Sequence, residues 1–444
     1  MSGLSLSRRF LVAVAASAAS ALLAGCAIAP SVAAPPAAVR AGVDVPAPSP
    51  SVEVTPAPLP VRETLEALLA KVSTKKIGTT GLVVTTTDGT VLADRGADKL
   101  LTPASTMKLF TTMTAVATLG ADTTFSTRVV DAGSGRIVVI GGGDPLLTNK
   151  VSKSIYKAAS LQQLARQTAA ALKASGRTSV SLGYDASLFS GPMWNSKWKS
   201  KWKPYEARIA ALEIDSGKVG WRAATNPPKT AASAFAKWLK KYGVKVTSVT
   251  SAKASANAAE VARVTSVPLS QIVKRTLKLS DNVAAETLSR HAAIAAGRPG
   301  SFAGGVATAK AWLVAHGNWA PGARIYDASG LAPADKVTAT MLAKAVVLAL
   351  GDATYAPVLD GLPIAGKDGT LKHRFDDKSE KAGVGVVRAK TGTLSRLASL
   401  AGYVTTASGH RLVFAELAND ANSYYTAYNW LDREAAVLAG CGCS

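Results

Sequence analysis

The sequence predicts an α+β fold in which an antiparallel sheet is flanked by helices and an accessory domain is inserted into the chain. Strand-like alternation of apolar and polar residues occurs near both ends of the folded part, at 79–98 and 384–419, and helical patterns lie between them. Short turns join the C-terminal strand patterns, which favours antiparallel pairing. We therefore expect strands from both ends of the chain to complete one sheet.

The first 60 residues resemble an export signal (1–26) followed by a linker (27–60). Arg8 and Arg9 precede an apolar, alanine-rich stretch that is typical of a secretory signal. The stretch ends in Leu-Leu-Ala-Gly-Cys, similar to a lipobox in which Cys26 becomes the lipidated first residue; in the alternative, an ordinary signal is cleaved beyond Cys26. The proline- and alanine-rich linker is expected to be an extended tether. We predict an exported protein of the cell envelope, in the periplasmic space or at the outer face of the membrane.

The 444 residues carry a formal net charge of +22, with 51 lysine and arginine residues against 29 aspartate and glutamate residues. A surface this basic fits either a solvated exterior or the binding of an anionic partner. For an exported chain we expect anionic cell-wall polymers or a membrane surface, and no nucleic acid. Tryptophans alternate with lysines at 194–203. This run fits either a surface that stacks on sugars or lies at a membrane, or a packed loop whose lysine stems cover aromatic rings.

The sequence contains three cysteines, and two of them, Cys441 and Cys443, lie at its very end with one glycine between them. An exported chain can oxidise them to each other; free thiols and an intermolecular bond are the alternatives. No cysteine and histidine spacing is typical of a zinc site. The glycine-rich loop at 141–143 lacks the lysine of a phosphate-binding loop and the spacing of a dinucleotide motif. We expect no metal and no cofactor.

Local patterns locate the elements in chain order. Alternation around Asp88-Gly89 predicts a hairpin, and a buried helix is predicted from Ser105 to a stop at Gly120. The other expected elements are a strand and glycine-rich loop at 136–148, helical and strand-like pieces that include 161–176 and 231–246, a long helical stretch at 270–297, and strands at 384–394, 397–409 and 411–419.

Three short motifs follow one another along the chain. Ser-x-x-Lys occurs five times, so its spacing alone is weak evidence, but the pair Ser105 and Lys108 opens an apolar helix. Ser-Asp-Asn, with Ser280 and Asn282, lies within the long helical stretch. Lys-Thr-Gly occurs once, with Lys390 at the end of a strand pattern. Each motif alone fits a helix cap, a polar helix surface or a strand end; the three in this order, on helix, helix and strand, indicate an active site.

The first motif fits acyl transfer through a serine. A serine hydroxyl becomes a good nucleophile when a neighbour takes its proton, and Lys108 follows Ser105 by three positions on one helix face. Burial and a nearby positive charge, for which Lys390 is the candidate, both lower a lysine pKa. The start of the helix adds partial positive potential and backbone N–H groups that help to hold an oxyanion.

The other two motifs fit proton relay and substrate binding. Ser280 is placed to relay a proton, and Asn282 to hydrogen-bond the lysine or a substrate amide. Thr391 and Thr393, on either side of Gly392, suit a terminal carboxylate. The chain has four histidines but no Gly-x-Ser-x-Gly element, so we expect no serine–histidine triad.

With these motifs the chain resembles the low-molecular-mass class C penicillin-binding proteins, the D-alanyl-D-alanine carboxypeptidase/endopeptidases. The resemblance covers nearly all of 61–431. It implies a serine β-lactamase/penicillin-binding (acyl-serine transferase) fold, with a discontinuous catalytic domain at 61–149 and 264–440 around an accessory domain at 150–263. Similar sequence blocks lie at 141–148, 326–331 and 362–375.

The resemblance also implies a reaction. Ser105 attacks the carbonyl between two D-alanines of a peptidoglycan stem peptide, with Lys108 as general base. Backbone N–H groups of Ser105 and Thr393 form the oxyanion hole, and Lys390, Thr391 and Thr393 hold the terminal carboxylate. β-Lactam antibiotics are the expected inhibitors. The alternatives are a β-lactamase- or esterase-like hydrolase on the same fold, and a cell-wall-binding protein without catalysis.

Overall fold

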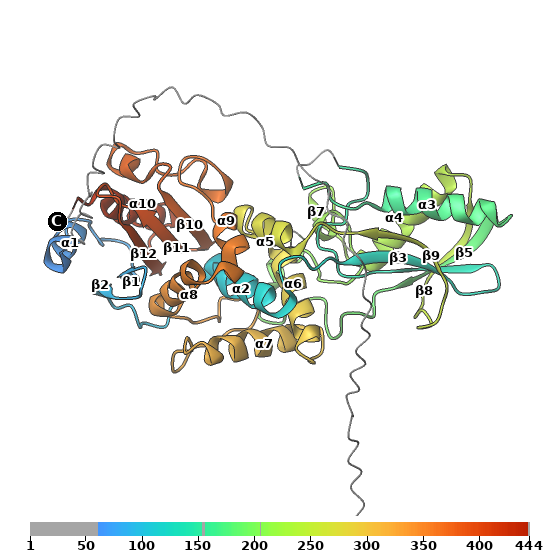
Figure 1. The fold of residues 1–444 in the computed structure, drawn as a ribbon, viewed down its shortest axis with the longest axis horizontal. Helices are drawn as coiled ribbons and strands as arrows, with labels where there is room; N and C mark the ends of the chain where they lie inside the picture. The colour runs from blue at the N-terminus through green and yellow to red at the C-terminus, as the bar shows by residue number, and fades with distance from the viewer. Residues whose placement is uncertain (1–60, 153–155, 205, 443–444) are drawn as a thin grey trace, which may run out of the picture. The chain divides into compact units, whose positions relative to one another are not determined.

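The computed structural model describes residues 61–152, 156–204 and 206–442. The predicted signal and linker, the lipidation candidate Cys26 and the terminal Cys443 lie outside the described residues. The described chain forms two five-stranded sheets and a two-stranded ribbon, and helices pack on both large sheets (Figure 1).

The first sheet joins both ends of the described chain. Its strand order is β10-β11-β12-β1-β2, and all neighbouring strands are antiparallel. Because β1 pairs along its whole length with β12, the prediction of an α+β fold with a sheet completed by both chain ends is confirmed. The strands are β1 Thr79–Thr86, β2 Val91–Arg95, β10 Val387–Leu394, β11 Leu397–Thr405 and β12 Arg411–Asn419.

Helices cover both faces of this sheet. Successive residues of a strand point to opposite faces, so Val83 lies in a core with α2, α5 and α8, whereas Leu82 and Val84 lie in a core with α1 and α10. Figure 1 shows α10 running along the β10–β12 strands. The helices of this part are α1 Arg62–Leu69, α2 Lys108–Leu119, α5 Leu269–Lys278, α6 Asn282–Ala295, α7 Phe302–Ala315, α8 Ala339–Gly351, α9 Ala356–Gly361 and α10 Tyr424–Gly440.

The local predictions hold with one correction. The hairpin turns at Gly89, whose φ is +91°, and α2 ends directly before Gly120, whose φ is +83°. The prediction of one long helical stretch at 270–297 is wrong. The chain breaks after α5 because Ser280 adopts a left-handed φ of +55°, and the Asp281 side chain then caps α6 by accepting a hydrogen bond from the Ala284 N–H at 3.1 Å.

The second sheet is mixed and has the order β8-β5-β4-β3-β9. β4, β5 and β8 run parallel, and β3 is antiparallel to both β4 and β9. The helices α3 Leu161–Ala174 and α4 Pro227–Lys241 supply the crossovers between the parallel strands and pack on the sheet (Figure 1). The strands are β3 Ser126–Asp131, β4 Arg136–Ile140, β5 Ser179–Asp185, β8 Lys245–Ser251 and β9 Glu260–Thr265, and the ribbon is β6 Lys218–Val219 with β7 Arg222–Ala223.

Two strands of this second sheet precede residue 150, where the sequence placed the start of the accessory domain. β3 and β4 hydrogen-bond within the sheet, and their residues Val129, Ile137 and Val139 share its core with α3 and α4. We therefore propose that the accessory domain spans 126–265.

Three remaining features bear on the sequence predictions. Among the described residues, no single helix is both long and apolar enough to cross a membrane, and α8 with the segment Ala353–Gly361 meets that test only as a pair bent by 105°. No cluster of metal-ligating side chains occurs in the same residues. Cys441 is disulfide-bonded.

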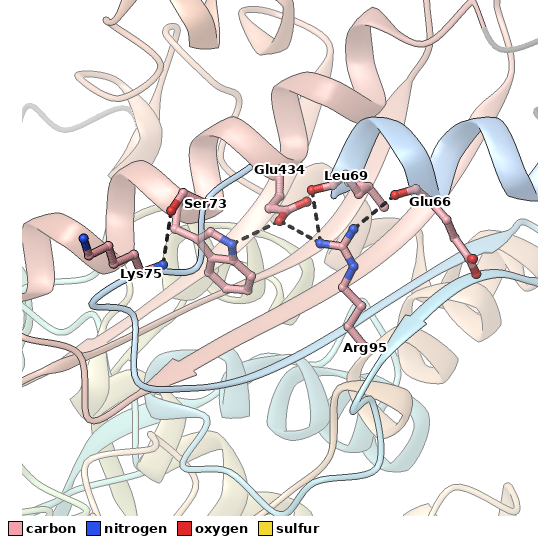
Figure 2. Close-up of polar contacts among 7 residues, drawn as sticks. Glu66, Leu69, Ser73, Lys75, Arg95 and Glu434 are labelled. Atoms are coloured by element: carbon pink, nitrogen blue, oxygen red, sulfur yellow. Dashed lines mark hydrogen bonds and ion pairs between the residues drawn. The ribbon is translucent and has the colours of Figure 1, made fainter. Parts of the chain in front are cut away.

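Arg95, at the end of β2, ties three elements together (Figure 2). Its guanidinium donates hydrogen bonds to the backbone carbonyls of Leu69 and Glu66 in α1, at 3.1 and 3.2 Å, and contacts the carboxylate of Glu434 in α10 at 3.4 Å. The Glu434 side chain is fully buried and also accepts a hydrogen bond from the Trp430 indole at 3.0 Å. Burial raises the pKa of Glu434 to about 7, against the opposing effect of Arg95.

Replacement of Arg95 by methionine therefore destabilises the fold in a pH-dependent way. Above the folded-state pKa of Glu434 the variant buries an unpaired carboxylate, and we expect the free energy of unfolding to fall by about 2–3 kcal/mol. As the pH falls below that pKa, Glu434 is already protonated in both proteins, so the difference shrinks. Urea unfolding above and below pH 7 measures both values.

Arg62→Met is the matched control, because Arg62 forms an exposed ion pair with Glu66 on the surface of α1. It should change stability by less than about 0.5 kcal/mol at either pH. If Arg95→Met lowers the free energy of unfolding equally above and below pH 7, the loss does not come from the unpaired carboxylate of Glu434.

Candidate active site

Ser105 lies in a 3₁₀ turn, Ala104–Met107, that leads directly into α2. The residue before it, Ala104, has a left-handed φ of +47°, which is rare for a residue with a side chain and is often found at functional sites. The residues at the N-cap positions of the turn and of α2 are Pro103 and Met107, and neither forms a side-chain capping hydrogen bond. Ser105 therefore lies inside the turn that starts the helix, and its hydroxyl is hydrogen-bonded to Lys108.

The Lys108 side chain is completely buried and points at that hydroxyl. Its Nζ donates hydrogen bonds to Ser105 Oγ at 2.9 Å, to Asn282 Oδ1 at 2.7 Å and to the backbone carbonyl of Ser329 at 2.7 Å. An ammonium has three donors, so this set satisfies it fully. Lys108 Nζ thus joins Ser105 of the first motif to Asn282 of the second, although 174 positions separate Lys108 from Asn282.

Burial lowers the pKa of Lys108 to about 8, and acidic neighbours, Asp327 first, act in the opposite direction. A lysine with this pKa holds its proton loosely at neutral pH, as a general base must. Lys390 is also fully buried, and its pKa is held well below the usual lysine range by burial and then by the positive charge of Lys108. Burial is thus the main cause at both lysines.

The third motif lies on β10, beside the turn that carries Ser105. Lys390 Nζ donates to Ser280 Oγ at 3.0 Å and to the Thr391 carbonyl at 2.6 Å, which joins the second and third motifs. Gly392 has no room for a side chain, because a Cβ there would lie 2.1 Å from Ser399 Oγ and 3.0 Å from the backbone N of Ser105. The glycine lets β10 run directly against the turn that carries Ser105.

A cavity of about 420 Å³ opens on these residues. Its wall includes Ser105 and Ser280 together with Thr391 and Thr393, so one residue or more of each motif faces the same space. Asn282 and the two lysines lie behind Ser105 and Ser280, at hydrogen-bonding distance from them or from each other. All the predicted catalytic and substrate-binding residues therefore belong to one site.

The cavity is also lined by residues that the sequence did not predict. They come from the segment before β10 and from α10: Gly369, Thr370, His373, Arg374 and Tyr428. Thr370 Oγ1 lies 2.7 Å from Thr391 Oγ1, and the Tyr428 hydroxyl lies 2.5 Å from Thr393 Oγ1. Four of these five residues lie in the block at 362–375, and its similarity to the family could have pointed to them. Nothing in the sequence pointed to Tyr428.

A buried hydrogen-bond network holds the loop at 326–331, whose Ser329 carbonyl accepts from Lys108. The backbone N–H groups of Ala328 and Ser329 donate to Glu286 at 3.0 and 2.9 Å, and Asp327 accepts from the backbone N–H groups at 330 and 332. Asp327 also accepts from the indole N–H of Trp198 at 2.6 Å. Trp198 is only 3% exposed. This tryptophan of the 194–203 run is thus packed into the site, as the packed-loop interpretation of that run predicts.

The comparisons with known proteins agree with this geometry. The model of the D-Ala-D-Ala carboxypeptidase 3 (S13) family matches residues 61–225 and 219–437. Carboxypeptidase Rv3627c of Mycobacterium tuberculosis is 37% identical over 82% of this chain and 80% of its own length. Carboxypeptidase DacB of Mycolicibacterium smegmatis is 36% identical over 87% of this chain and 86% of its own length.

The fold is also that of a solved structure. The crystal structure of penicillin binding protein 4 from Haemophilus influenzae superimposes with a TM-score of 0.70 at 21% identity, over 83% of this chain and 97% of that one. The extent of the family match, together with the two mycobacterial relatives, establishes that the chain belongs to the D-Ala-D-Ala carboxypeptidase 3 (S13) family and is a serine-type D-Ala-D-Ala carboxypeptidase.

Proposed function

We propose that Ser105 is the nucleophile and Lys108 the general base of this carboxypeptidase. The observation that carries the proposal is the 2.9 Å hydrogen bond from Lys108 Nζ to Ser105 Oγ, made by a buried lysine whose pKa is lowered to about 8. In the neutral form Lys108 accepts the Ser105 proton as Oγ bonds to the carbonyl carbon between the two D-alanines. Asn282 holds Lys108 in place at 2.7 Å.

The next steps use the other motifs. Backbone N–H groups of Ser105 and Thr393 are the proposed oxyanion hole, supported by the close approach of β10 to the Ser105 turn at Gly392. As the C–N bond breaks, the leaving D-alanine amine takes a proton, for which Ser280 is the proposed relay. Water then attacks the acyl-serine ester and releases the shortened peptide with Ser105 regenerated.

The terminal carboxylate of the substrate is proposed to bind at the β10 wall of the cavity. Thr391 and Thr393 present hydroxyls there, and Lys390 lies directly behind them, hydrogen-bonded to Ser280. Arg374 adds a cation to this wall and is paired with Asp432 through hydrogen bonds of 3.0 and 2.6 Å. Positive charge around hydroxyl donors suits a carboxylate.

The same chemistry extends to related substrates. A β-lactam presents a strained amide and a carboxylate, so we propose that it acylates Ser105 and remains as a slowly hydrolysed ester; a β-lactam complex is known for the Haemophilus influenzae protein. Cleavage of cross-links between stem peptides, export to the cell envelope and lipidation at Cys26 remain predictions. So does the bond between Cys441 and Cys443.

Ser105→Ala should abolish both stable labelling by fluorescent penicillin and release of D-alanine from a pentapeptide ending in D-Ala-D-Ala. The physical reason is the loss of the attacking oxygen. Ser200→Ala removes the serine of another Ser-x-x-Lys pair and should leave both readouts unchanged. Rapid penicillin turnover by the unaltered protein would instead favour the β-lactamase-like alternative, and absence of labelling the binding protein.

The rate of acylation should rise with pH and level off above about 8, because only neutral Lys108 accepts the serine proton. Asn282→Asp places a carboxylate where an amide oxygen now lies 2.7 Å from Lys108 Nζ. It stabilises the ammonium and should move the inflection to higher pH. Stopped-flow acylation by penicillin across a pH series measures the inflection.

Asn422→Asp, an exposed change outside the cavity wall, is the control and should leave the inflection in place. An inflection that is identical in the unaltered protein and in Asn282→Asp would show that Lys108 is not the group that titrates.

Gly392→Ala should slow acylation by about a hundredfold or more, because a methyl group forces β10 away from the Ser105 turn and misplaces the reacting groups. Gly351→Ala is the matched control, since nothing lies within 4 Å of a Cβ at that position. Penicillin acylation rates of the two variants, each checked for an unchanged melting temperature, provide the test. Equal rates would contradict the close fit proposed at Gly392.

A further inference from the structure

A cavity of about 750 Å³ lies outside the active site, in the accessory domain that we propose. Its walls are the exposed face of α4 with the residues just before it, β6 with Gly220, and the chain around 149–150 and 214–215. It shares no residue with the cavity that contains Ser105. We call it the α4 groove.

Five lysines line the α4 groove, against one acidic residue, Asp215. The Asp215 carboxylate is already occupied, because it accepts a hydrogen bond from the Asn149 backbone N–H at 3.1 Å. Among the described residues, none of the five lysines forms an ion pair. The lysines are Lys150, Lys218, Lys229, Lys237 and Lys241.

Three of these lysines lie on one face of α4. Positions 229, 233, 237 and 241 are four apart and so form one row, while Phe235 and Leu239 on the opposite face are buried in the core. α4 contains no aspartate or glutamate. Lys237 and Lys241 are like charges at i,i+4, an arrangement that destabilises a helix unless an anion lies nearby.

The groove also contains an aromatic wall and a strained turn. Trp238 lines it, held by a 2.9 Å hydrogen bond from its indole N–H to Asn149 Oδ1, with Lys241 Nζ 5.1 Å from its ring centroid. Asp215 and Ser216 both adopt left-handed φ values, +53° and +54°, next to the groove. Consecutive non-glycine residues in this conformation are costly and are often found where a ligand binds.

The proposed accessory domain carries most of the net charge of the chain. Residues 126–265, about a third of the chain, contain 22 lysine and arginine residues and seven aspartate and glutamate residues, so they supply 15 of the 22 net positive charges. The rest of the chain supplies seven. The anionic partner that fits the overall charge therefore has its counterpart in the accessory domain, away from the catalytic motifs.

We propose that the α4 groove binds an anionic glycan chain of the cell envelope. The lysines face the acidic groups of the polymer, and Trp238 packs against the apolar face of a sugar ring. A concave site is favoured over a membrane contact because the lysines converge on a cavity, whereas a bilayer surface needs a flat or protruding basic face. Binding there would hold the enzyme in the cell envelope, close to its stem-peptide substrate, while Ser105 remains accessible.

The test compares two triple variants of the full chain that remove equal charge from the same domain. K229Q/K237Q/K241Q neutralises the row on α4, and K173Q/K245Q/K253Q neutralises exposed lysines outside the groove. The probe is polygalacturonate, a uronic acid polymer, with uncharged dextran as its control, measured by calorimetry at low ionic strength. Circular dichroism and penicillin labelling confirm that each variant is folded.

The unaltered protein should bind polygalacturonate but not dextran, and the affinity should fall steeply with salt. The groove variant should bind at least about tenfold more weakly and the control variant less than about twofold. Equal weakening in both variants would overturn the proposal in favour of diffuse charge attraction. Binding to anionic phosphatidylglycerol vesicles without binding to polygalacturonate would overturn it in favour of a membrane surface. Failure of the glycan proposal and failure of the proposed catalytic function are distinguishable. If the groove variant is still labelled by penicillin, its active site is intact, and only the glycan proposal is at stake.

Discussion

The active site depends on a single buried ammonium. Lys108 has no exposure to solvent, and its three donors are used by Ser105 Oγ, Asn282 Oδ1 and the carbonyl of Ser329. These partners come from the 3₁₀ turn before α2, the start of α6 and the loop at 326–331, so the position of the lysine requires all three segments to be correctly packed. Burial makes the positive charge of Lys108 costly and its proton easier to lose, which is the property that the general-base role we propose for it requires.

Two neighbouring parts of the structure, β10 and the segment around Trp198, contact the residues around Lys108. β10 approaches the Ser105 turn closely because Gly392 has no side chain, and the left-handed residues Ala104 and Ser280 bring the backbone into the site at two places. On the other side, Trp198 of the accessory domain anchors Asp327 beneath the lysine. The accessory domain that we propose therefore contacts the buried network around Lys108 through Trp198, in addition to the glycan-binding role that we propose for its α4 groove.

Much of this was predictable from sequence, since motif order and strand alternation are local signals. The three motifs, the sheet formed by both chain ends and the helix after Ser105 were all expected. The break between α5 and α6 was missed because apolar periodicity continues across it, and only the left-handed φ of Ser280 reveals it. Tyr428 and Glu286 were missed because their roles arise from contacts with distant segments. The accessory-domain start that we propose, at 126, differs from the expected 150, because the pairing of β3 and β4 with the second sheet is a contact between distant segments.

The most direct test of the central claim is to locate the acyl group itself. The full chain is treated with penicillin, digested, and the modified peptide is sequenced by tandem mass spectrometry. The account predicts one adduct, on Ser105, that is absent from Lys108→Met protein with an unchanged melting temperature. An adduct on the serine of any other Ser-x-x-Lys pair, or full modification of Ser105 at an unchanged rate without Lys108, would contradict it.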